Sequence, residues 1–93
     1  GGELSTTPVA VPTSPVIIGD DGTGDHTYAL IAIGVQGRRT APSPASKANG
    51  RAQLRWNSTP GADAYIVVRD GQEITGPLRI EGSQKHWNDK PPR

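Results

Sequence analysis

The sequence predicts an all-β fold, a small sandwich of about seven short antiparallel strands. Strand-like segments follow one another at intervals of roughly 8–12 residues, with turn formers between them. The chain contains 12 glycines and 9 prolines, which suits short strands joined by many turns. No stretch sustains the 3.6-residue period of an amphipathic helix. These observations together exclude a helical domain.

The stretch from residue 53 to 70 is the part around which the rest of the chain must pack. Leu54 and Trp56 alternate with polar residues, which predicts a half-buried strand. Turn formers follow over residues 57–63, and a run rich in β-branched residues then begins a second strand that ends at an Asp-Gly pair. The residues expected in the core are Trp56, Tyr65, Val67, Tyr28, Leu30, Ala32 and Leu54.

Residues 26–35 predict a central strand, because the residues on both of its alternating faces are apolar. Prolines before it favour a polyproline-like or edge segment over residues 8–15, and a short edge strand over residues 16–18. The remaining segments are a turn at 19–25, a hairpin connection at 36–39, a proline-broken edge strand at 40–46, a turn at 47–51, an alternating segment at 78–81 and a last strand at 85–89.

The length of 93 residues gives room for one domain, which buries roughly 60–65% of the surface that its unfolded chain exposes. We expect a flexible tail at residues 1–7, a single sandwich at 8–90 and the start of a linker at 91–93. The chain begins with Gly-Gly, which indicates a part of a longer protein. Without cysteine it has no disulfide, thiolate nucleophile or cysteine metal site.

The net charge of +1 does not suggest the dense phosphate neutralisation of a nucleic-acid-binding protein. The sequence has no apolar run of about 18 residues and no signal-peptide pattern, so we expect neither a membrane partner nor a nucleic-acid partner.

Two stretches resemble the fibronectin type III family, an immunoglobulin-like sandwich. The resemblance covers residues 26–90. One stretch resembles the B–C corner of the family in bacterial and phage proteins: Leu54-x-Trp56, then Pro60-Gly61-Ala62, Tyr65-x-Val67 and Arg69-Asp70-Gly71. The other resembles the F strand, the F–G turn and the G strand: Tyr28-x-Leu30-x-Ala32, then Gly37 and Ala41-x-Ser43. Trp87-x-Asp89 is similar to the aromatic-x-Asp that ends an inner strand in those modules.

The chain departs from the family pattern in two ways. His26 stands where the resemblance expects the tyrosine of the tyrosine corner, so an imidazole would have to make that hydrogen bond. The F–G stretch also precedes the B–C stretch. Either the strand order is permuted or the chain straddles two domains, and we prefer one permuted domain. Such permuted modules are familiar in bacteriophage tailspikes and tail fibres and in bacterial surface or carbohydrate-active proteins.

No constellation of residues predicts catalysis, a metal or a cofactor, so we expect the chain not to be an enzyme. His26 and His86 lack a partner that the sequence identifies, and structural or surface roles suit them better. Asp20, Asp21 and Asp25 lie in a turn, but their spacing does not fit a calcium loop. We therefore expect a plain loop there.

Three residues are candidate ligand contacts. Trp87 has polar neighbours and is either an inner aromatic residue or a half-exposed platform for carbohydrate. Arg38 and Arg39 at a loop tip could hold an acidic glycan or the carboxylates of a partner, although a solvated hairpin tip is the plainer interpretation.

The resemblance implies a non-catalytic structural or adhesion module that positions neighbouring domains of a larger protein, on a virion tail or at the cell surface. We expect the isolated module to be a monomer whose partners are those domains or other tail and surface proteins. The alternative is a carbohydrate-binding module that recognises bacterial surface polysaccharide.

Overall fold

The computed structural model describes residues 9–89 and confirms the predicted all-β sandwich. The expected tail at 1–7 and the expected linker at 91–93 lie outside these residues. The strands are β1 (Val16–Asp20), β2 (Asp25–Gly34), β3 (Ser46–Asn49), β4 (Ala52–Asn57), β5 (Ala62–Arg69), β6 (Gln72–Glu73) and β7 (Gln84–Asn88). Among the described residues, no helix has the length and apolar character needed to cross a membrane.

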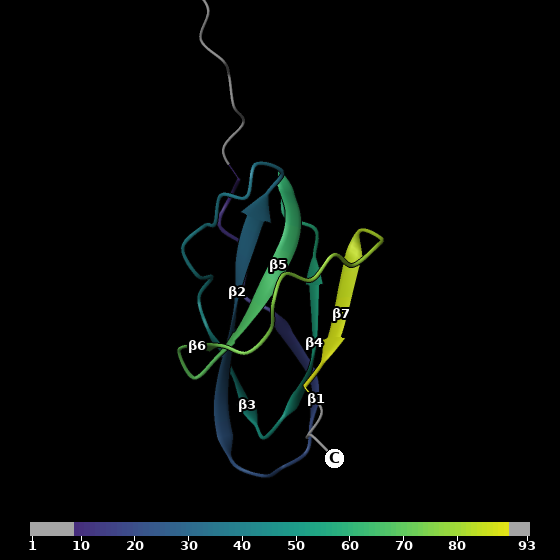
Figure 1. The fold of residues 1–93 in the computed structure, drawn as a ribbon. Helices are drawn as coiled ribbons and strands as arrows, with labels where there is room; N and C mark the ends of the chain where they lie inside the picture. Colours follow the sequence, from purple (N-terminus) through teal and green to yellow (C-terminus); the bar gives the residue numbers. More distant parts are fainter. Residues whose placement is uncertain (1–8, 90–93) are drawn as a thin grey trace, which may run out of the picture.

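The strands form two antiparallel sheets, one in the order β1-β4-β7 and the other in the order β3-β2-β5-β6 (Figure 1). The longest pairing joins β2 to β5, from Tyr28 opposite Arg69 to Gly34 opposite Ala62. The strand β2 of the F–G-like stretch therefore pairs with β5, the second strand of the B–C-like stretch, whereas the first strand of that stretch, β4, lies in the other sheet. This arrangement is consistent with an immunoglobulin-like sandwich.

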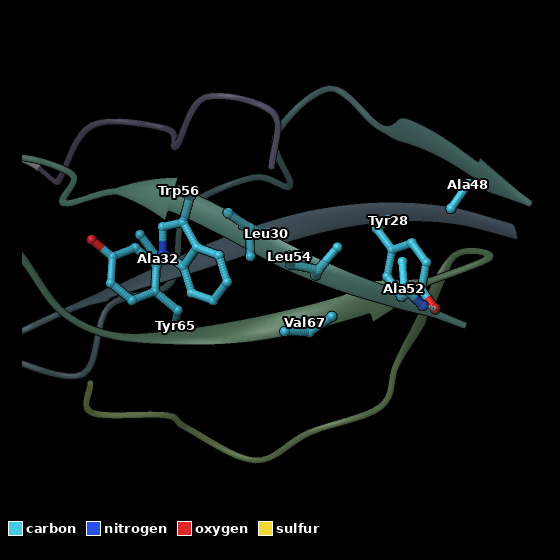
Figure 2. Close-up of a cluster of buried hydrophobic side chains, with 9 residues drawn as sticks. All are labelled: Tyr28, Leu30, Ala32, Ala48, Ala52, Leu54, Trp56, Tyr65 and Val67. Atoms are coloured by element: carbon cyan, nitrogen blue, oxygen red, sulfur yellow. Dashed lines mark hydrogen bonds between the residues drawn. The ribbon is translucent and has the colours of Figure 1, made fainter. Parts of the chain in front are cut away.

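The core lies between the two sheets, where β2 and β5 face β4. All seven residues expected in the core are 2% exposed or less. Trp56 and Tyr65 meet edge to face at one end, with ring centroids 5.5 Å apart. Figure 2 shows Tyr28 and Ala52 at the other end of the cluster, with Leu30, Leu54 and Val67 between. Aromatic residues thus fill both ends of a small core.

The central pair β2–β5 is also apolar on its outer face, as the sequence predicts for a central strand. This outer row consists of Ala29, Ile31, Ile33, Ala64, Ile66 and Val68, all 8% exposed or less. Arg39 stands beside Ile33, and Glu73 stands beside Val68 on the far side of the pair. Since Arg39 Nη1 donates to Glu73 Oε2 over 2.8 Å, this ion pair spans both strands on the outer face.

Three sequence predictions were wrong in detail. The turn expected at 47–51 is mostly strand β3, and the chain reverses at Gly50 and Arg51 instead. The alternating segment 78–81 forms only an isolated bridge between Leu78 and Tyr65. The expected edge strand at 40–46 is irregular, because Thr40 and Ser43 bond to β2 through both backbone and side chain around two prolines.

Candidate functional site

The three candidate ligand contacts do not form one site. Trp87 in β7 lies opposite Leu54 in β4 and packs, half-buried, against the core of the sandwich. Arg39 belongs to the other sheet and is held by Glu73, while Arg38 is exposed in the loop after β2. A ligand that contacted Trp87 would therefore be on a different sheet from one that contacted the arginines.

A partly buried polar cluster joins the two sheets around Asp89. The hydroxyl of Tyr28 in β2 donates to Asp89 Oδ2 over 2.5 Å, and Arg69 Nη1 in β5 donates to the same oxygen over 2.6 Å. The Ala52 N–H in β4 donates to the Tyr28 oxygen over 3.1 Å, and the Asp89 N–H donates to the Ala52 carbonyl. The side chain of Asp89 is 8% exposed, so these are charge-assisted bonds shielded from water.

The cluster raises the pKa values of Tyr28 and Arg69, and both shifts keep these hydrogen-bond donors protonated. Burial and the bond to Asp89 raise the pKa of Tyr28 to about 12, because both disfavour the phenolate. The hydrogen bond from Arg69 to Asp89 raises the pKa of that guanidinium. Both groups thus keep their protons at neutral pH, and both donate to Asp89.

His26 forms a second pair, with its Nδ1 2.6 Å from Asp70 Oδ2. The other carboxylate oxygen of Asp70 accepts the Thr27 N–H over 2.9 Å. The Thr27 bond first, and His26 second, lower the pKa of Asp70. Asp70 has φ of 52° and begins the Asp70-Gly71 turn between β5 and β6, so this pair ties the turn to β2.

The acidic turn after β1 is hydrogen-bonded to the neighbouring β3–β4 turn. Asp21 Oδ1 accepts from the Thr23 hydroxyl, from the Thr23 N–H and from the Arg51 N–H, and these bonds lower its pKa. Asp20 Oδ2 accepts the Asn49 N–H. Within residues 9–89 no three metal-ligating side chains come together. These two carboxylates thus hold the β1–β2 turn against the β3–β4 turn.

The first and last described segments are fixed at opposite ends of the sandwich (Figure 1). Val9 packs on Gly34, and the Ala10 N–H donates to the Pro60 carbonyl, at the end where β2 finishes and β5 begins. Asp89 is held beside Tyr28 and thus near the other end of the β2–β5 pair. Six residue steps of β2 separate Tyr28 from Gly34, which corresponds to about 20 Å.

Sequence reasoning missed the role of these polar residues, although one signal pointed to it. The aromatic-x-Asp pattern includes Asp89, but its partners Tyr28 and Arg69 are 61 and 20 residues away. The hydroxyl bond between the sheets comes from Tyr28, whereas His26 bonds to Asp70.

Comparison of the chain with family models, curated proteins and solved structures gave no match.

Proposed function

We propose that this chain is a non-catalytic structural module that holds the domains before and after it at a fixed separation. The resemblance of its strands to fibronectin type III modules of phage tails and bacterial surface proteins makes such a parent protein our proposal. One observation supports the spacer role: the first and last described segments lie at opposite ends of the sandwich, and each is hydrogen-bonded to it.

The exit is the firmer of the two ends. Asp89 accepts from Tyr28 and Arg69, which belong to the two central strands, and its backbone bonds to Ala52 in the opposite sheet. The position of Asp89 is therefore set by both sheets. The entrance is set by Val9 and Ala10 against the β2 and β5 ends. Such anchoring transmits position from one neighbour to the next.

The edges of the three-stranded sheet favour a module that does not add strands to itself. In β7, Lys85 lies opposite the buried Trp56, and its ammonium group donates to the carbonyls of Ile80 and Gly82. A register shift interrupts the pairing of β1 between Ile17 and Gly19. Inward-pointing lysines and bulges are devices that blunt free edges against pairing. These features support a monomeric spacer in a linear array.

The spacer role can be tested by fusing two fluorescent domains, one before Val9 and one after Asp89. Single-molecule energy transfer should give one narrow distance population. Asp89→Ala should broaden that population while circular dichroism shows that the sandwich remains folded, and Asp25→Ala, an exposed aspartate in β2, serves as the matched control. A broad population in the unaltered chain, or equal effects of the two substitutions, would contradict the proposal.

A further inference from the structure

Six planar polar side chains occupy the outer face of the β4–β7 pair. Leu54 and Trp56 point into the core, so the residues that alternate with them along β4 point outward. The six stand in three cross-strand pairs: Gln53 with Asn88, Arg55 with His86, and Asn57 with Gln84. Four carboxamides thus surround one guanidinium and one imidazole. The three rows extend over about 13 Å along the strands.

The charge of this face has one sign. Its outward positions on β1, β4 and β7 carry no carboxylate, and the only lysine of β7, Lys85, turns toward the core. Neither Arg55 nor His86 takes part in the four ion pairs found among the described residues. By contrast, the outer face of the other sheet pairs Arg39 with Glu73. The β4–β7 face therefore keeps an unneutralised guanidinium among groups that both donate and accept.

These groups match one chemical class. A guanidinium fork binds a carboxylate through two parallel hydrogen bonds. Each carboxamide offers two N–H donors and a carbonyl acceptor, which suits hydroxyl groups that likewise donate and accept. A chain of sugars that carries carboxylates presents both kinds of group along an extended line. We propose that the outer face of β4–β7 binds an anionic, carboxylate-bearing polysaccharide, with the carboxylate on Arg55.

This site is separate from Trp87 and from the loop arginines, and the proposal does not rest on the spacer function. Trp87 lies in the same strand as His86 and Asn88 but on its opposite face, against the core. The face is exposed at all of its positions except Arg55, which is half-buried, so a polymer can reach it without rearrangement of the fold.

The test is a titration of the nitrogen-15-labelled chain with polygalacturonate, followed by amide chemical shifts. Shifts should be confined to β4, β7 and the adjacent β1. Arg55→Gln should weaken binding at least about tenfold, because it removes a charge-assisted pair. Arg38→Gln makes the same change of charge in the exposed loop and should leave the affinity unchanged. His86→Gln, at an exposed position, provides a second variant on the face if Arg55→Gln fails to fold.

Three results would overturn the proposal. One is the absence of shifts at millimolar polymer. Another is a set of shifts on residues 34–40, with Arg38→Gln as the damaging substitution. The last is equal binding of polyglutamate or of neutral dextran. Equal binding of polyglutamate would mean that any polyanion suffices, and equal binding of dextran would mean that the carboxylate contributes nothing.

Discussion

The hydroxyl of Tyr28 provides the sharpest test of how the two sheets are joined. Tyr28→Phe removes one oxygen from a side chain that is 0% exposed and leaves the aromatic ring in place. The substitution deletes the donor to Asp89 and the acceptor of the Ala52 N–H. It therefore breaks a link between β2, β4 and the end of β7 without opening a cavity of any size.

The expected loss of stability follows from these two hydrogen bonds. A hydrogen bond to a charged group contributes about 1.5–3 kcal/mol, and a buried N–H left without a partner costs about 1–3 kcal/mol. We expect Tyr28→Phe to lower the free energy of unfolding by about 3 kcal/mol. A domain of this length is stable by about 5–14 kcal/mol, so the loss is a large part of its stability. Since each kcal/mol lost shifts the unfolding temperature of a small domain by several degrees, the midpoint of thermal unfolding should fall by about 15 °C.

Urea unfolding, followed by the fluorescence of Trp56 and Trp87, measures this loss. The matched control is Tyr65→Phe, whose hydroxyl accepts one neutral bond, the Thr59 N–H at 2.6 Å. The control should cost about 1–2 kcal/mol, because no charged partner is involved. The reasoning is refuted if Tyr28→Phe costs less than 1 kcal/mol or no more than the control does.

The remaining predictions concern turns and pH. Gly50→Ala should lower the free energy of unfolding by about 3 kcal/mol, because Gly50 has φ of 119° and a Cβ there would overlap Asp21 Oδ1. Gly37→Ala, at φ of 81° in open space, should cost only about 1 kcal/mol in the same urea assay. The stability that Asp70 contributes is present above the usual carboxyl pKa and lost as pH falls below it, so acid titration of Asp70→Asn should show a shallower loss. The raised pKa of Tyr28 acts at the other limit: its contribution is complete below pH 10 and lost toward about pH 12, and Tyr28→Phe should lack this alkaline loss.

The sequence predicted those parts of the fold that depend on local periodicity. Leu54 and Trp56 alternate with polar residues, and β4 has the same alternation of buried and exposed positions. The run after Tyr28 is apolar on both faces, and β2 is central with a buried row on each face. The Asp70-Gly71 pair also ended β5 as predicted. Periodicity reports which faces are buried, and burial is what determines these elements.

Other parts could not be predicted, since they depend on contacts between distant residues. The segment from Lys47 to Asn49 has the composition of a turn. It nevertheless pairs with β2, and Ala48 is buried in the core. The segment 78–81 has the alternation of a strand, but it pairs with β5 only through a single bridge between Leu78 and Tyr65. The partners of Asp89 and Asp70 come from other strands, and no spacing in the chain identifies them. For the same reason, the polar face of β4 and β7 emerges only once their register is known.

The most direct test of the spacer account is the distance between the two ends of the sandwich. The chain has no cysteine, so Ala10→Cys and Asn88→Cys provide two unique positions for spin labels. Both sites are exposed and lie next to the anchored segments. Pulsed dipolar spectroscopy should show one narrow distance population at roughly 20–25 Å, the length of the β2–β5 pair with the labels added. A broad population, or one centred well below this length, would contradict a module that holds its neighbours apart.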